Sequence, residues 1–186
     1  FSREVAEKTL VLLKNENDFL PLDRNKFNSI AVIGPNANSR DALIGNYFGT
    51  ASKYVTVLEG IQNAVNPDTR VYYSEGSHLY REQVEGLSQA KDRFAAERAD
   101  VVVMCIGLDA NIEGEEGDAS NEYASGDKKH LNLPGVQQDL IEAVYKTGKP
   151  IILVLLSGSA LAVTWADEHL PAIIQGWYPG EEGGTA

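Results

Sequence analysis

Val101-Val102-Val103-Met104-Cys105-Ile106 is a continuous apolar run, and the loop that follows it, residues 107–118, reads Gly-Leu-Asp-Ala-Asn-Ile-Glu-Gly-Glu-Glu-Gly-Asp. Such a run predicts a strand that is buried on both faces, as in the middle of a parallel sheet. The loop holds five acidic residues and no Lys or Arg, so mutual repulsion should raise the pKa of at least one carboxyl group. Because open α/β sheets bind ligands at the carboxyl ends of their strands, this loop is a candidate functional site.

Strand and helix signals alternate along the rest of the chain. Short apolar or β-branched runs predict further strands at residues 29–33, 70–73, 150–156 and 172–176. Apolar residues at helical spacing predict helices at residues 2–14, 56–65, 83–98, 135–147 and 160–167. Alternation of this kind predicts a mostly parallel sheet with helices on both faces. The predicted fold class is therefore α/β, a three-layer sandwich that forms one domain over residues 1–186.

The composition suits a globular domain and excludes some partners. The chain has 186 residues, of which 43% are hydrophobic, enough for a sizeable core. A net charge of -11 argues against nucleic acid or an anionic membrane as the main partner. No apolar run approaches the roughly 20 residues of a membrane-spanning helix. Cys105 is the one cysteine and can form no intrachain disulfide, so the cellular compartment stays undetermined.

Both ends of the sequence have the character of internal positions. The chain begins at Phe1 with no Met and no signal-peptide pattern. It stops at Gly183-Gly184-Thr185-Ala186 without a terminating element. We therefore expect this chain to be a piece of a longer protein.

The acidic loop allows three interpretations on its residues alone. It can be a solvated loop without a function. It can be a calcium site, since Asp109-x-Asn111-x-Glu113-Gly114 matches the first half of an EF-hand loop, although its twelfth position is Ser120 and a strand precedes it. It can also hold a glutamate that acts as a general acid. The spacing does not choose between these.

Other motifs carry weaker signals. Trp177-Tyr178 follows the last predicted strand and can be a core plug or a platform that stacks on a sugar ring. Ser157-Gly158-Ser159 lacks the G-x-S-x-G pattern of a nucleophile elbow, and the three histidines are scattered without zinc-ligand spacing. Gly34-Pro35-Asn36 ends a strand without a phosphate-binding glycine pattern, which argues against a nucleotide-binding domain.

Motifs along the whole chain, taken in order, match one family. They are Leu12-Leu13-Lys14-Asn15, Leu20-Pro21-Leu22, Ile30-Ala31-Val32-Ile33-Gly34-Pro35-Asn36-Ala37, Gly45-Asn46-Tyr47-Phe48-Gly49, Val55-Thr56-Val57-Leu58-Glu59-Gly60-Ile61, the acidic loop with Leu133-Pro134-Gly135-Val136-Gln137, and Trp177-Tyr178-Pro179-Gly180-Glu181-Glu182-Gly183-Gly184-Thr185-Ala186. Together they resemble the second domain of family 3 glycoside hydrolases. Because the resemblance is collinear over essentially the whole chain, it is more specific than any single motif.

The resemblance implies a β-glucosidase or β-xylosidase that retains anomeric configuration through a covalent glycosyl intermediate. In that family an N-terminal (β/α)8 barrel supplies an aspartate nucleophile, and an α/β sandwich supplies the general acid/base glutamate. This chain resembles the sandwich alone. We therefore expect the barrel of the same parent chain as its partner, a β-linked glucoside or xyloside as substrate, no metal or other cofactor, and no activity in isolation. A continuation beyond Ala186 is implied as well.

The family pattern also implies site residues. Glu113 is the first choice for the acid/base, followed by Glu115 and then Glu116. The Asp-Arg pair common after these glutamates is missing, and Asp118-Ala119 and Asp127-Lys128 stand where it would be sought. The residues expected to bind substrate are Asn46, Tyr47, Asp109, Trp177 and Tyr178. A retaining mechanism needs two carboxyl groups about 5 Å apart, which a loop projecting from the sheet edge can provide across a domain interface. The alternative function is a non-catalytic carbohydrate- or calcium-binding module.

Overall fold

The structure is a computed structural model that describes residues 1–81, 95–114 and 128–186. Its centre is a six-stranded sheet in the order β1-β6-β5-β4-β2-β3. The strands are β1 (Val11–Asn15), β2 (Ser29–Ile33), β3 (Arg70–Ser74), β4 (Val101–Gly107), β5 (Ile151–Leu156) and β6 (Ala172–Gln175). Neighbouring strands run parallel, except that β1 is antiparallel to β6. The mostly parallel sheet is therefore confirmed, with the apolar run at 101–106 in its interior.

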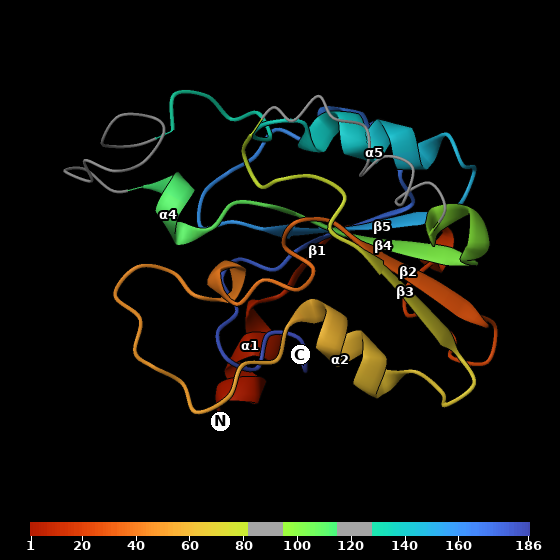
Figure 1. Cartoon of the computed structure of the whole chain (residues 1–186), viewed down its shortest axis with the longest axis horizontal. Helices are drawn as coiled ribbons and strands as arrows, with labels where there is room; N and C mark the ends of the chain where they lie inside the picture. Colours follow the sequence, from red (N-terminus) through yellow and green to blue (C-terminus); the bar gives the residue numbers. More distant parts are fainter. Residues whose placement is uncertain (82–94, 115–127) are drawn as a thin grey trace.

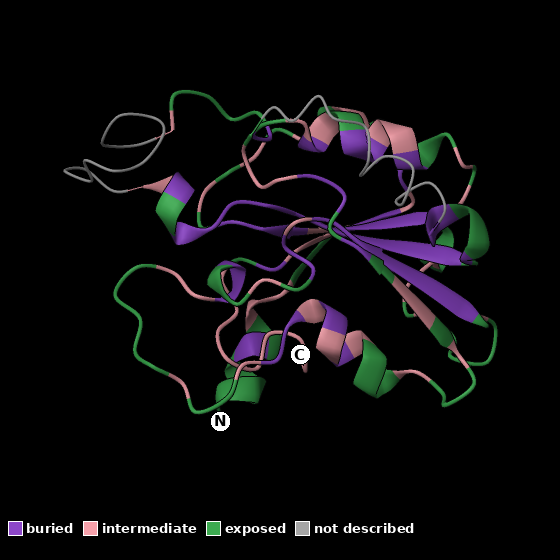
Figure 2. Cartoon of the chain, viewed as in Figure 1, coloured by how far each residue is buried: buried purple, intermediate pink, exposed green. Residues whose placement is uncertain are grey.

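Alternate residues of β4 pack into two separate apolar cores. One core includes Val102, Met104 and Ile106, and the other includes Val101, Val103 and Cys105. Helix α5 (Gln137–Tyr145) covers the first core and α2 (Val57–Ala64) covers the second. Figure 1 shows these helices on opposite sides of the sheet, and Figure 2 shows the buried strands between them. Burial raises the pKa of the Cys105 thiol to about 12, as expected of a core residue.

The first predicted helix is too long. Helix α1 (Ser2–Thr9) ends before Leu10, and the segment predicted to continue it to residue 14 is the edge strand β1. Leu12 of that strand pairs with Ile174 of β6, and a bulge follows. The prediction was wrong because the apolar spacing at residues 12 and 13 fits a helix locally. The backbone partner that makes it a strand lies near the other end of the chain.

Helices α2 and α5 begin and end near their predicted positions. Thr56 caps α2 by accepting a hydrogen bond from the backbone N–H of Glu59. Helix α5 falls within residues 135–147, whereas α6 (Thr164–His169) begins later than predicted. Of the helix predicted at 83–98, residues 95–98 are helical and 83–94 lie outside the described residues. A short helix, α4 (Ala110–Glu113), follows β4, and two 3-10 helices lie at Glu16–Asp18 and Asp41–Leu43.

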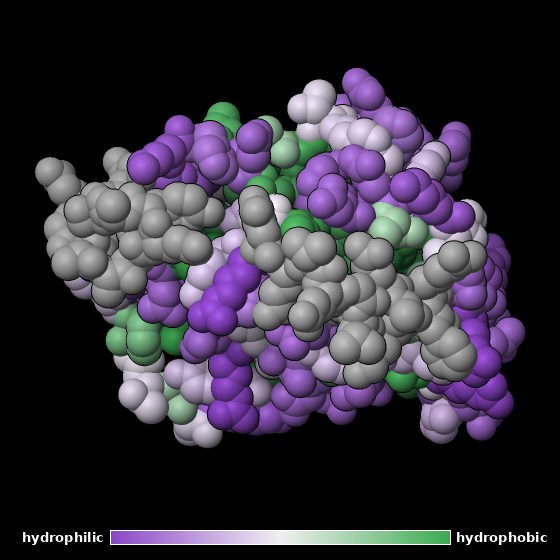
Figure 3. Space-filling view, turned by 45° about the horizontal axis from the view of Figure 1, so that its top comes forward, coloured by the Kyte–Doolittle hydropathy of each residue, from purple (hydrophilic) through white to green (hydrophobic). Residues whose placement is uncertain are grey.

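On the face shown in Figure 3, the coloured residues are mostly hydrophilic, and hydrophobic residues form separate smaller areas. Some apolar side chains are exposed, among them Leu12 at 53% and Leu13 at 56% on the edge strand β1. Over the described residues, no helix is long and apolar enough to cross a membrane.

Candidate active site

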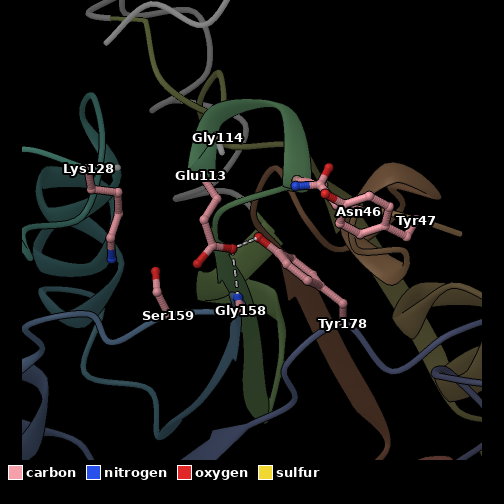
Figure 4. Close-up of a pocket in the computed structure, with 9 residues that line it drawn as sticks. Asn46, Tyr47, Glu113, Gly114, Lys128, Gly158, Ser159 and Tyr178 are labelled. Atoms are coloured by element: carbon pink, nitrogen blue, oxygen red, sulfur yellow. Dashed lines mark hydrogen bonds between the residues drawn. The ribbon is translucent and has the colours of Figure 1, made fainter. Parts of the chain in front are cut away.

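A pocket of about 410 Å³ lies where several strands reach their carboxyl ends. The segment after β4 contributes Glu113, the segment after β5 contributes Gly158, and the segment after β6 contributes Tyr178 (Figure 4). The full lining is Asn46, Tyr47, Ala110, Glu113, Gly114, Lys128, Gly158, Ser159 and Tyr178. Ligands bind at this edge of open parallel sheets because loops from several strands converge there.

Helix α4 (Ala110–Glu113) brings Glu113 to this pocket. Strand β4 ends at Gly107, where φ is 135° and a side chain would approach a backbone oxygen of β5 to 2.1 Å. Asp109 then caps the helix, since its carboxylate accepts hydrogen bonds from the backbone N–H groups of Asn111 (2.9 Å) and Ile112 (3.0 Å). Such a cap satisfies the donors that a helix start leaves unpaired. It holds the single turn whose last residue faces the pocket (Figure 4).

Gln137, buried at the start of α5, holds the strand end from which this segment departs. Its Oε1 accepts a hydrogen bond from the N–H of Gly107 at 2.8 Å. Its Nε2 donates to the carbonyl oxygens of Gly107 (2.9 Å) and Leu79 (2.6 Å). One side-chain amide therefore satisfies both backbone groups of Gly107 at the point where the strand ends.

The Glu113 carboxylate is held through one of its oxygens. Oε2 accepts a 2.9 Å hydrogen bond from the backbone N–H of Gly158 and a second hydrogen bond from the Tyr178 hydroxyl. Figure 4 shows Oε1 turned toward the side of the pocket where Lys128 and Ser159 lie. The carboxylate thus has one oxygen fixed by donors and one that faces the pocket.

Two other groups set the electrostatics around Glu113. Burial, followed by the hydrogen bond with Glu113, raises the pKa of Tyr178, so its hydroxyl stays protonated and remains a donor. Burial lowers the pKa of Lys128, while the charge of Glu113 acts in the opposite direction. The Lys128 ammonium also donates a hydrogen bond to the carbonyl oxygen of Ala160, which holds a positive charge across the pocket from Glu113 (Figure 4).

The structure gathers some of the residues that the sequence singled out and separates others. Those that line the pocket are Asn46, Tyr47, Glu113 and Tyr178. Asp109 is buried as a helix cap. Trp177 lies outside the pocket lining, is 42% exposed and has a left-handed φ of 56°. Glu115 and Glu116 lie outside the described residues.

Lys128, Gly158 and Ser159 line the pocket but were not among the predicted site residues. A signal existed for two of them, because Ser157-Gly158-Ser159 follows the buried strand β5 as the acidic loop follows β4. The Ser159 hydroxyl is buried and has no hydrogen-bond partner in the described part of the chain. Lys128 has no local pattern that distinguishes it from a surface lysine. Within residues 1–81, 95–114 and 128–186, no cluster of His, Cys, Asp and Glu could hold a metal ion.

Comparisons with known proteins point to one family of glycoside hydrolases. Residues 10–186 match the family described as the glycosyl hydrolase family 3 C-terminal domain. The whole chain aligns with 25% of the length of a β-xylosidase of Formosa agariphila, and the aligned residues are 38% identical. It also aligns with 25% of the length of a periplasmic β-glucosidase of Salmonella typhimurium, at 36% identity. The chain therefore spans about a quarter of the length of these curated relatives.

Solved structures show the same fold. A family 3 exo-β-xylosidase in complex with a xylobiose aziridine activity-based probe superimposes with a TM-score of 0.84 at 32% identity, over 98% of this chain and 22% of that one. A β-glucosidase from Erythrobacter marinus superimposes with a TM-score of 0.82 at 29% identity, over 98% of this chain and 26% of that one. In each case the similarity covers about a quarter of the larger protein.

Proposed function

Because this chain belongs to glycosyl hydrolase family 3 and matches its C-terminal domain over residues 10–186, we propose that it supplies the general acid/base of a retaining β-glycosidase. The substrate is a β-linked glucoside or xyloside, and another domain of the full-length protein supplies the nucleophilic carboxylate. Relatives described as a β-xylosidase and a periplasmic β-glucosidase support this substrate class. The chain covers 25% of each relative, which supports a division of the catalytic groups between domains.

The observation that carries the proposal is the setting of the Glu113 carboxyl group. It lies in a pocket at the carboxyl edge of the sheet, with Oε2 held by Gly158 and Tyr178 and with Oε1 turned into the pocket (Figure 4). A general acid/base must be fixed within reach of the reacting oxygen. A carboxyl group with one anchored oxygen and one presented oxygen meets that requirement.

In the first step, Glu113 begins as the neutral acid and gives its proton to the glycosidic oxygen. The bond between that oxygen and the anomeric carbon breaks, and the nucleophilic carboxylate forms a bond to the same carbon from the opposite face. The leaving alcohol departs, and Glu113 is left as a carboxylate.

In the second step, the Glu113 carboxylate takes a proton from water. The water oxygen bonds to the anomeric carbon as the bond to the nucleophile breaks, which restores both carboxyl groups to their starting states. The net reaction consumes one water and releases the sugar with its anomeric configuration retained.

The test uses the full-length protein that carries this domain and compares Glu113→Ala with matched controls from the same loop, Glu115→Ala and Glu116→Ala. Each variant is assayed on alkyl and dinitrophenyl β-glucosides and β-xylosides, with and without azide. For Glu113→Ala we expect kcat/KM to fall by about 10²-fold or more on the alkyl glycosides, because their leaving group needs a proton. We expect a much smaller loss on the dinitrophenyl glycosides, whose leaving group needs no proton, and formation of a glycosyl azide.

Each pattern of results separates one part of the proposal. If Glu115→Ala or Glu116→Ala shows the leaving-group dependence and azide rescue instead, the acid/base lies two or three positions further along the loop. If no variant shows them, the catalytic role of this loop is wrong. The 186-residue chain alone should be inactive, and turnover by it would contradict the assignment of the nucleophile to another domain.

A further inference from the structure

We propose that Tyr178 is a positioning residue for Glu113, whose hydroxyl holds Oε2 and thereby presents Oε1 to the leaving-group oxygen of the substrate. This inference rests on the proposed acid/base role of Glu113. It differs from the role predicted for Tyr178 from the sequence, where the ring binds substrate. The difference matters because the two roles depend on different parts of one side chain.

The ring of Tyr178 is held by two glycine backbones. A Cβ atom on Gly45 would lie 3.2 Å from Cδ2 of the ring, and a Cβ atom on Gly158 would lie 2.9 Å from Cε2. Both carbon atoms belong to one edge of the ring, so that edge occupies the space that a side chain at either glycine would need, and the two backbones limit where the edge can lie. The hydroxyl at the end of this rigid ring is limited in position as well.

The backbone on each side of Tyr178 is also anchored. The N–H of Gly176 donates to a carbonyl oxygen of β5 at 2.7 Å, and the N–H of Gly180 donates to that of Leu43 at 2.7 Å. Between them, the backbone of Trp177 has a φ of 56°, which residues other than glycine rarely adopt. Such conformations persist where the surrounding structure holds them, and they concentrate at functional sites. The turn after β6 therefore places the hydroxyl rather than leaving it to rotate freely.

The hydroxyl keeps its proton while Glu113 exchanges one. Burial and the hydrogen bond to Glu113 raise the pKa of Tyr178 above its ordinary value, so the phenol remains a donor in both steps of the reaction. Because Oε2 already accepts hydrogen bonds from Gly158 and Tyr178, the single acid proton of neutral Glu113 belongs on Oε1. Proton exchange with the substrate then occurs at the oxygen that faces the pocket (Figure 4).

The test removes the hydroxyl and keeps the ring. In the full-length protein, Tyr178→Phe should lower kcat/KM on alkyl β-glycosides about tenfold or more, the expected effect of losing a hydrogen bond to a group that becomes charged as it gives up its proton. On dinitrophenyl β-glycosides, which need no proton donor, we expect a change of less than about twofold. The KM for either substrate should change little, because the ring still packs against Gly45 and Gly158. Tyr73→Phe, which removes a hydroxyl from the edge strand β3, should match the unmodified protein on both substrates.

The kcat/KM on dinitrophenyl glycosides measures how much folded enzyme the sample contains. A variant that has lost structure falls on both substrates, whereas a variant that has lost only the position of Glu113 falls on the alkyl glycosides alone. An equal fall on both substrates, or no fall on the alkyl glycosides, overturns the inference. If Glu113→Ala shows leaving-group dependence and Tyr178→Phe does not, this inference alone fails. If Glu113→Ala shows none, the proposed acid/base role fails first.

Discussion

The backbone N–H of Gly158 donates a 2.9 Å hydrogen bond to Oε2 of Glu113, and so joins two segments that are 45 residues apart in the sequence. One segment follows β4 and the other follows β5, and these strands are parallel neighbours in the sheet. The contact exists because parallel pairing brings both strand ends to the same edge.

Replacing Gly158 with Ala should disturb this contact without removing the donor. The added Cβ atom would lie 2.9 Å from Oε2 of Glu113 and 2.9 Å from Cε2 of Tyr178, closer than such atoms can approach. If Glu113 is the acid/base as proposed, a displacement of this kind should lower kcat/KM of the full-length protein on alkyl glycosides by roughly tenfold to a hundredfold. Gly49→Ala is the control, because its Cβ atom would meet nothing within 4 Å. Unchanged kinetics of Gly158→Ala would show that Glu113 tolerates the shift.

Asp109 should act through its cap and not through its charge. Losing an N-cap costs about 1 kcal/mol, so Asp109→Ala should weaken α4 and lower the rate on alkyl glycosides by roughly fivefold. Asp109→Asn keeps an oxygen that can accept from Asn111 and Ile112 and should stay within about twofold of the unmodified protein. If Asn is as damaging as Ala, the carboxylate charge itself is used, as a calcium or substrate contact would require.

Gln137 should contribute mainly to stability. Gln137→Ala leaves the N–H and the carbonyl oxygen of Gly107 buried without the amide that they bond. Unsatisfied buried groups of this kind predict a loss of about 2–4 kcal/mol in the free energy of unfolding. Denaturant titration followed by circular dichroism measures the loss. The neighbouring Gln138→Ala, whose side chain bonds Glu142 on the same helix, should change the free energy by less than about 0.5 kcal/mol. Equal losses in the two variants would contradict the anchoring role.

Asp100 should make stability fall in acid. Hydrogen bonds from the backbone N–H of Asn28 and then from Ser29 lower the pKa of Asp100 below its ordinary value. A group whose pKa is lower in the folded state stabilises the fold above its unfolded pKa, and that stabilisation is lost as the pH falls through the folded pKa. The thermal midpoint of Asp100→Asn should therefore lie below that of the unmodified protein near neutral pH. The two should converge below about pH 4, and a gap independent of pH would refute the assignment.

Most of the sheet could be predicted because its signal is local. The strand β4 is apolar at every position, and a strand that is buried on both faces requires this composition wherever it lies in the chain. The capped helix α2 was equally predictable, since Thr56 and the apolar residues after it act over one or two turns. The strand β1 was not, because the spacing of Leu12 and Leu13 is compatible with a helix until β6 is available as a partner.

The site divides in the same way. The family pattern singled out Glu113, Asn46, Tyr47 and Tyr178. In the structure these four residues line the same pocket. The sequence could not show that Asp109 is used as a cap, that the Tyr178 hydroxyl is turned to Glu113, or that Lys128 lies across the same pocket.

The sequence by itself determined the α/β class, the buried strands and the loops that carry candidate chemistry, because composition and periodicity act over a few neighbouring residues. Only the tertiary structure decided which atoms meet. Hydrogen bonds such as those from Gly158 and Tyr178 to Glu113 form between the ends of different strands. Their geometry depends on how the strands pair and on where each turn directs the chain.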